Sequence, residues 1–316
     1  MSLAFIFPGQ GSQAVGMGKA LADVSPAARA VFAEVDEALG QKLSKLMWEG
    51  PEAELTLTEN AQPALMAVSL AVLRALEAEH GVKLNDAAKF VAGHSLGEYS
   101  ALAAAGTFSL ADAARLLKTR GRAMQQATPV GTGAMAALLG LDFPEAAAVA
   151  EAAAQGEICQ AANDNAPGQV VVSGHKAAVE RAVALAKDKG AKRAVLLQVS
   201  APFHCALMEP AAQVMAEALA NTPMRPPTVP VFANVLASPL SDPAAIRQAL
   251  VRQVTGTVRW RECMAGMAAR GVKLFCEVGS GKVLSGLVKR TAPEAQGLAL
   301  GSPEDIAQNA AQLKQG

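Results

Sequence analysis

The feature that most constrains how this chain folds is the pentapeptide Gly-His-Ser-Leu-Gly at residues 93–97. It matches the G-x-S-x-G pattern, in which a serine occupies a tight turn between a β-strand and an α-helix. Residues 89–92, Lys-Phe-Val-Ala, predict the end of a buried strand, and Ala-rich residues 98–105 predict a helix that Gly106 ends. The flanking glycines allow the sharp bend because they carry no Cβ atom. The pattern therefore indicates an α/β protein.

Ser95 is the candidate nucleophile at this turn. A hydroxyl at the N-terminal end of a helix lies where the helix dipole and free N–H groups stabilise a developing negative charge. The alternative is that Ser95 only caps the helix. A base within reach of the serine would decide between the two interpretations.

The composition argues against several kinds of partner. The 316 residues carry no net charge and only 18% of them are charged, so no overall field favours nucleic acid or an anionic membrane surface. No apolar run approaches the roughly 20 residues that span a bilayer, and residues 3–7 lack the basic segment of a signal peptide. The four cysteines form no C-x-x-C pair, which favours a reduced, cytoplasmic protein without a metal site.

The order of the expected elements indicates a small subdomain inserted into a larger α/β domain. In the larger domain, strands are expected at 3–7, 89–92, 229–233 and 273–278, and helices at 26–39, 63–79, 98–105 and 110–126. Between them, the pattern predicts strands at 134–140, 157–162, 169–172 and 194–199, and helices at 144–154 and 175–188. That order is β-α-β-β-α-β, the ferredoxin-like pattern. We expect one discontinuous domain over 1–127 plus 200–316, and a ferredoxin-like subdomain over 128–199.

A serine nucleophile needs a base, and histidine is the usual one. His80 ends a predicted helix, His175 opens one, and the side chain of His94 should point away from its neighbour Ser95. His204 lies just past the 194–199 strand, and strand ends are where α/β folds gather catalytic loops. His204 is the best candidate base, although a packed histidine satisfied by the backbone is the alternative.

No acid stands out as the partner of that histidine. Enzymes with this turn usually place an acidic residue between the serine and the histidine in the sequence. Asp142, Asp164 and Asp188 lie in or beside the predicted subdomain, and none has a distinctive setting. A backbone carbonyl or a side-chain amide therefore orients His204, or the acid is not visible in the sequence.

Arg120 is the second candidate functional residue, and helical geometry points to it. Along the predicted 110–126 helix, an apolar stripe is formed by Ala113, Leu116, Leu117 and Met124. Arg120 falls in the middle of this stripe, and a buried arginine is costly unless it meets an anion. It either pairs with a structural carboxylate or reaches water along its stem, or it clamps a substrate carboxylate with two hydrogen bonds.

Residues 9–14, Gly-Gln-Gly-Ser-Gln-Ala, also fit the G-x-G-x-x-A dinucleotide fingerprint. A dinucleotide-binding unit would need a second strand within about 30 residues, whereas residues 26–39 have a helical pattern. We therefore expect this turn to supply a backbone N–H group that completes an oxyanion hole with the N–H of Leu96.

Taken together, these motifs resemble those of malonyl-CoA:acyl carrier protein transacylases, from residue 3 to about residue 290. The residues that carry the resemblance are Phe7-Pro8-Gly9-Gln10-Gly11-Ser12-Gln13, Gln62-Pro63-Ala64, residues 93–98, Arg120-Gly121, residues 165–169, Phe203-His204 and residues 277–282. The resemblance implies an α/β hydrolase-like domain with a ferredoxin-like insertion. It also implies that Ser95 is acylated and that His204 is its base.

Further roles follow from the same resemblance. Arg120 would bind the malonyl carboxylate, and the N–H groups of Gln10 and Leu96 would form the oxyanion hole. Gln62 and Gln253 match further active-site positions, the latter near the carbonyl that orients the histidine. Many stand-alone bacterial members have serine before the histidine, whereas this chain has Phe203. A bulky ring there should disfavour a methyl branch, so malonyl is expected over methylmalonyl.

The resemblance implies transfer of a malonyl group from malonyl-CoA to the phosphopantetheine thiol of acyl carrier protein, for fatty acid biosynthesis. No cofactor is expected, and the protein should be a monomer. A malonyl transferase of a polyketide or malonate decarboxylase system is an alternative. A serine thioesterase would explain the turn but not Arg120, and a non-catalytic carrier-binding module would not need Ser95, His204 and Arg120 together.

Overall fold

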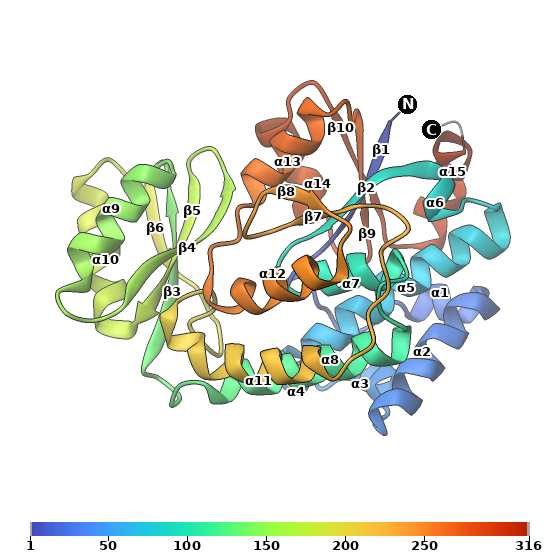
Figure 1. Ribbon diagram of the computed structural model, residues 1–316, viewed down its shortest axis with the longest axis horizontal. Helices are drawn as coiled ribbons and strands as arrows, with labels where there is room; N and C mark the ends of the chain where they lie inside the picture. Colours follow the sequence, from blue (N-terminus) through green and yellow to red (C-terminus); the bar gives the residue numbers. More distant parts are fainter. Residues whose placement is uncertain (1, 315–316) are drawn as a thin grey trace.

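The computed structural model describes residues 2–314 and confirms the α/β class. Within those residues, one sheet of six strands has the order β10-β9-β1-β2-β7-β8. Its strands are β1 (Leu3–Phe7), β2 (Ala88–Gly93), β7 (Val231–Ala233), β8 (Ser238–Leu240), β9 (Leu274–Val278) and β10 (Gln296–Leu300). All neighbouring pairs are parallel except β7 and β8. Strand β1 lies between β2 and β9, in the middle of the molecule's larger part (Figure 1).

Strand β1 shows how the core is arranged. All five of its residues are buried, as expected of a parallel strand covered on both faces. Phe5 and Phe7 belong to the core cluster that includes the long helix α5 (Thr58–His80). Ala4 and Ile6 belong to a second cluster, around Trp260, on the other face. The alternation of side chains along the strand therefore separates the two halves of the core.

Helices enclose this sheet on both faces. The remaining helices of this part are α1 (Lys19–Val24), α2 (Pro26–Leu39), α3 (Leu43–Glu49), α4 (Glu52–Thr56), α6 (Leu84–Ala87), α7 (Gly97–Ala104), α8 (Leu110–Gln126), the 3-10 turn at Ala206–Met208, α11 (Glu209–Ala220), α12 (Pro243–Thr255), α13 (Trp260–Ala269), α14 (Val283–Thr291) and α15 (Pro303–Leu313). Helix α5 packs against α2 and α8. Gly121 permits this contact, because a Cβ atom there would lie 2.5 Å from the carbonyl oxygen of Thr58.

Helix α5 departs from two sequence expectations. It begins at Thr58 rather than at residue 63, so Pro63 lies inside it. It is also, among the described residues, a helix long and apolar enough to cross a membrane, contrary to the expectation that no apolar stretch reaches that length. However, 78% of its most apolar window is buried inside the protein. Its apolarity thus reflects its position at the centre of the core.

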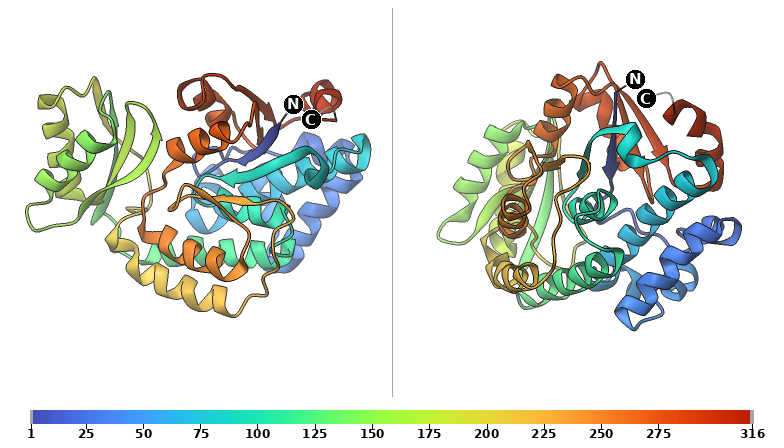
Figure 2. Two further views of the ribbon diagram at one scale, coloured as in Figure 1. Left: turned by 45° about the horizontal axis from the view of Figure 1, so that its top comes forward. Right: turned by 45° about the vertical axis from the view of Figure 1, so that its right-hand side comes forward.

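The second part of the molecule has its own antiparallel sheet and core. Its elements are β3 (Gly133–Leu139), α9 (Phe143–Ala154), β4 (Cys159–Ala166), β5 (Gln169–His175), α10 (Lys176–Asp188) and β6 (Arg193–Leu196). The strands have the order β4-β5-β3-β6, and α9 and α10 contribute to a separate apolar cluster beside them. This unit stands to one side of the larger part in all three views (Figures 1 and 2).

The element order of this unit agrees with the predicted one, but β6 is shorter. It ends at Leu196, three residues before the predicted end. Residues 197–200 leave the sheet and run along a cavity between the two parts. The first part of the apolar run 194–199 therefore belongs to the sheet, and the rest lines the cavity. The sequence pattern alone does not show where one ends and the other begins.

Candidate active site

The tight turn between β2 and α7 has the geometry that its glycines predict. Ser95 adopts a positive φ of 54°, a strained conformation for a residue with a side chain. A Cβ atom at Gly93 would lie 1.9 Å from the backbone of Gly97, and one at Gly97 would lie 2.3 Å from the carbonyl oxygen of Phe7. Both positions therefore require glycine, and the Ser95 hydroxyl is presented above the sheet at the start of α7.

His204 lies within hydrogen-bond distance of this serine. Its Nε2 is 2.7 Å from Ser95 Oγ, and its Nδ1 is 2.8 Å from the backbone carbonyl oxygen of Gln253. Because a carbonyl can only accept, Nδ1 carries the proton and Nε2 is left to accept the serine proton. The partner that orients His204 is thus a backbone carbonyl, one of the possibilities left open by the missing acid.

The electrostatic setting keeps His204 neutral. Burial and, after it, the nearby charge of Arg120 lower the pKa of His204 to about 3. His204 also has a positive φ, of 58°. A neutral imidazole in a constrained position is suited to accept a proton from the serine.

Arg120 is fully inside the protein, as its place in the apolar stripe predicts. It is 1% exposed, and its guanidinium donates from Nη1 to Gln62 Oε1 (2.8 Å) and from Nη2 to Gln253 Oε1 (2.8 Å). The same Nη2 lies 3.2 Å from Ser95 Oγ. Among residues 2–314 no carboxylate forms an ion pair with it, so neither a structural carboxylate nor escape to water explains its burial.

Two backbone N–H groups beside the serine are free. In the described part of the chain, the N–H groups of Gln10 and Leu96 donate to no protein acceptor. Both residues line the same cavity as Ser95. The side chain of Gln10 is held in turn by a 3.2 Å bond from its Nε2 to Thr58 Oγ1. These N–H groups are available to a negatively charged oxygen.

A cavity of about 330 Å³ joins these groups. It lies between the larger part and the antiparallel unit, which contributes Met135 from β3 and Val171 from β5. Its lining includes Gln10, Gln62, Ser95, Leu96, Arg120, Phe203 and His204. Gln253 lies behind the cavity wall, where it is 0% exposed. The structure thus brings together all eight candidate residues, seven around the cavity and one behind it.

Comparisons with known proteins show to which family the chain is similar. A family model described as "Acyl transferase domain" matches residues 4–308. The malonyl CoA-acyl carrier protein transacylase of Escherichia coli (strain K12) is 49% identical over 304 residues, covering 96% of this chain and 97% of the relative. A solved acyl-carrier-protein S-malonyltransferase from Bartonella henselae is 56% identical, with a TM-score of 0.96 and 99% coverage of both chains.

This chain belongs to the malonyl CoA-acyl carrier protein transacylase family. The family members are acyltransferases, and the same enzyme class holds for this chain. Another similar structure is a malonyl-transacylase in complex with a type II PKS acyl-carrier protein. It is 43% identical, with a TM-score of 0.95, and the match covers 99% of this chain and 100% of that one.

Three residues complete the network, and reasoning from sequence did not single them out. Asn234 Oδ1 accepts the N–H of Ser95 at 2.8 Å, and Glu98 Oε2 accepts from Gln253 Nε2 at 2.7 Å. Asn165 Oδ1 is 2.8 Å from Nε2 of His94, and both residues line the cavity of Ser95. Two signals were present: Glu98 is an acid in an otherwise apolar helix, and Asn234 directly follows the predicted strand 229–233.

Three other polar residues considered in the sequence have structural partners. His175 Nδ1 accepts the N–H of Ile158, and Asp142 accepts the N–H of Gly168. Asp164 is held by both of its oxygens to Arg261. Within the described chain, no group of three or more His, Cys, Asp or Glu side chains is placed to hold a metal ion.

Proposed function

We propose that this chain transfers a malonyl group from malonyl-CoA to the phosphopantetheine thiol of an acyl carrier protein, through a malonyl-serine intermediate. The observation that carries the proposal is the position of Arg120, whose Nη2 is 3.2 Å from Ser95 Oγ. A nucleophile with a buried cation beside it is suited to an acyl group that itself ends in a carboxylate. The names of the relatives support the same substrate and acceptor.

In the first half-reaction, His204 Nε2 takes the proton of the Ser95 hydroxyl as Oγ attacks the thioester carbon. The carbonyl oxygen becomes an oxyanion, which the N–H groups of Gln10 and Leu96 stabilise. The imidazolium, stabilised through Nδ1 by the Gln253 carbonyl, then protonates the departing CoA thiolate. The products are free CoA thiol and a malonyl ester on Ser95.

The second half-reaction runs through the same groups in reverse. The pantetheine thiol of the carrier gives its proton to His204 and attacks the ester carbon, and Ser95 Oγ leaves with that proton. Water competes for the same ester. Met124, Met135 and Val171 make part of the cavity wall apolar, which disfavours bulk water near the ester.

Arg120 and Phe203 would select the acyl group in this proposal. The guanidinium already donates to two neutral amide oxygens, so a carboxylate would give it an anionic partner in a buried setting. Phe203 is buried beside His204 and lines the cavity. A bulky ring at this position would crowd a methyl branch, so we expect malonyl to be preferred over methylmalonyl.

The test is incubation with labelled malonyl-CoA, with and without carrier protein. If the chain transfers malonyl, the carrier protein becomes labelled. The intact mass of this chain should also show a malonyl adduct, which the Ser95→Ala variant should lack. A thioesterase would release free malonate as the main product. A non-catalytic carrier-binding module would form no adduct.

We further infer that residues 1–127 plus 200–316 form an α/β hydrolase-like domain and residues 128–199 a ferredoxin-like subdomain. The antiparallel strand order β4-β5-β3-β6 with two helices supports the second assignment. We place the protein in the cytoplasm, as a monomer without cofactor, serving fatty acid biosynthesis. Its similarity to a malonyl-transacylase bound to a type II PKS carrier supports polyketide carriers as the alternative acceptors, and transfer to each kind of carrier would separate the two.

A further inference from the structure

Glu98 is a buried carboxylate that the proposed reaction does not use. It lies in the first turn of α7, two residues after Leu96, and is 1% exposed. Its Oε2 accepts from Gln253 Nε2 at 2.7 Å and from the backbone N–H of Asn234 at 3.2 Å. Burying a carboxylate against neutral groups is costly, so the position calls for an explanation.

The two partners of Glu98 hold every reacting group of the site. Gln253 accepts from His204 at its backbone carbonyl, accepts from Arg120 at Oε1, and donates from Nε2 to the carbonyl oxygen of Ser95 (3.0 Å). Asn234 accepts the N–H of Ser95 and donates from Nδ2 to the carbonyl oxygen of Gly93 (2.8 Å). Any movement of these two side chains would therefore move the serine turn and the arginine together.

The amide of Gln253 works in only one orientation. A guanidinium can only donate, so Arg120 needs the oxygen end of the amide. The NH2 end donates to Glu98 Oε2, the same oxygen that accepts the backbone N–H of Asn234. A flipped amide would set N–H groups against N–H groups at Arg120 and oxygen against oxygen at Glu98. Glu98 and Arg120 thus fix the same orientation of the amide from its two ends.

We propose that Glu98 is a positioning residue, which fixes the Gln253 amide and through it holds Arg120 and the Ser95 turn in place for acyl transfer. For its effect on malonyl recognition, the inference rests on the proposed function. For its effect on the nucleophile, it rests on the hydrogen bonds alone.

The test compares Glu98→Gln with wild type in steady-state transfer of malonyl and acetyl groups from CoA to carrier protein. We expect kcat/KM for malonyl-CoA to fall by on the order of 10- to 100-fold, as for a small displacement of a binding group. We expect a smaller fall for acetyl-CoA, so the malonyl/acetyl ratio decreases. A merely structural role would lower kcat/KM equally for both substrates and leave the malonyl/acetyl ratio unchanged.

The matched control is Glu277→Gln, which removes another fully buried carboxylate, one that accepts from the backbone and hydroxyl of Ser285 on α14 and from no residue of the Glu98 network. It should leave the malonyl/acetyl ratio at the wild-type value. If Glu98→Gln does not fold, Gln253→Ala tests the same link and should lower the ratio as well. In the double variant that combines Glu98→Gln with Gln253→Ala, the malonyl/acetyl ratio should be no lower than in Gln253→Ala alone, because the effect of Glu98 passes through Gln253.

A fluorophosphonate probe separates this inference from the proposed function, since it labels an activated serine without needing malonyl-CoA. Slower labelling of Ser95 in Glu98→Gln would support the positioning role even if wild type transferred no malonyl group. Wild-type transfer combined with an unchanged ratio and unchanged labelling in Glu98→Gln would overturn the inference. An unchanged ratio in a folded Gln253→Ala would overturn it too.

Discussion

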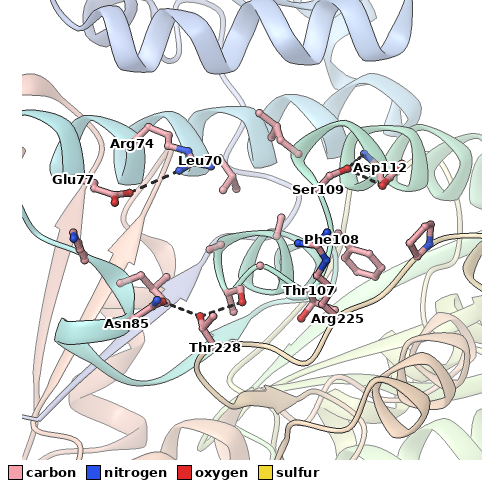
Figure 3. Close-up of a pocket in the computed structure, with 18 residues that line it drawn as sticks. Leu70, Arg74, Glu77, Asn85, Thr107, Phe108, Ser109, Asp112, Arg225 and Thr228 are labelled. Atoms are coloured by element: carbon pink, nitrogen blue, oxygen red, sulfur yellow. Dashed lines mark hydrogen bonds and ion pairs between the residues drawn. The ribbon is translucent and has the colours of Figure 1, made fainter.

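Two cavities lie along the same pair of helices and differ in what their polar groups do. The one at Ser95 has a volume of about 330 Å³, and a larger one of about 480 Å³ lies toward the other ends of α5 and α8 (Figure 3). Gln62 and Arg120 face the first cavity, whereas Arg74 and Asp112 of the same helices face the second. Each helix therefore carries polar residues to both.

In the larger cavity, several polar side chains are paired with one another, although the buried hydroxyl of Thr107 has no partner among the described residues. Figure 3 shows Arg74 with Glu77, Ser109 with Asp112, and Asn85 with Thr228, at 3.7, 2.7 and 2.8 Å. At the smaller cavity, polar groups converge on Ser95 from several elements, and two N–H groups have no protein partner. Ser95 and His204 there also have strained, positive φ angles. The convergence of polar groups on one strained serine, rather than volume, marks the reactive cavity.

The largest expected difference between the two cavities comes from Ser95→Ala. It should lower acyl transfer by on the order of 10⁴- to 10⁶-fold, because the group that is acylated is gone. Thr228→Ala, which removes a hydroxyl from the larger cavity, is the matched control and should keep wild-type transfer. Both rates come from transfer of labelled malonyl to carrier protein. Transfer by Ser95→Ala near the wild-type rate would contradict the nucleophile assignment.

Arg120→Ala should have the next largest effect. It should cost about 2–5 kcal/mol in kcat/KM for malonyl-CoA, the usual range for removing one partner of a buried charge pair. The preference for malonyl-CoA over acetyl-CoA should disappear with it. Arg122→Ala, on the exposed face of the same helix, should change neither value. An unaltered preference in Arg120→Ala would reject the role of carboxylate binding.

Phe203→Ala should change selectivity more than rate. Removing the ring should raise methylmalonyl transfer relative to malonyl transfer by about tenfold, since one methyl group is worth 10-fold or more in a tight pocket. Competition between the two CoA esters measures the ratio. Labelling of Ser95 by a fluorophosphonate should stay at the wild-type rate. A ratio that does not move would show that the ring does not limit the acyl group.

The titration of His204 tests the electrostatics of the smaller cavity. Burial and the charge of Arg120 lower the pKa of His204 to about 3, so its NMR signals should not titrate near pH 6.5, the ordinary value for histidine. In Arg120→Ala the pKa should rise, because the repelling charge is lost. The unfolded chain protonates His204 below about pH 6.5 and the native state does not, so this residue lowers stability as the pH falls further. A pKa near 6.5 for His204 in the wild-type protein would contradict the conclusion that burial and Arg120 keep this residue neutral.

The smallest expected effect belongs to the larger cavity. Arg74→Ala removes an ion pair whose side chains are 59% and 46% exposed, so the free energy of unfolding should change by less than about 0.5 kcal/mol. Acyl transfer should be unchanged. Denaturant unfolding and the transfer assay measure the two quantities. A clear loss of transfer would show that this cavity contributes to function and would break the contrast drawn between the two.

Sequence reasoning succeeded where neighbours along the chain decide the structure. The helix over residues 110–126 and the buried position of Arg120 followed from spacing on one helix face. The Ser95 turn followed from its two glycines. In contrast, α5 starts five residues earlier than expected, because its burial against α2 and α8 outweighs the preference of Pro63 for a helix start. The edge strands β8 and β10 were not predicted. Strand β8 has only three residues, and β10 has a single buried residue, Leu300, and so lacks the apolar run of a central strand.

By itself, the sequence determined the local geometry: which residues bend sharply, which helix face is apolar, and which arginine is forced inside. Only the tertiary structure decided that Glu98, Asn234 and Gln253 meet behind Ser95. These residues lie up to 155 positions apart along the chain, and their contact depends on parallel strand pairing that brings β2 and β7 side by side. Such pairing results from burial of the whole sheet, and no short stretch of residues encodes it.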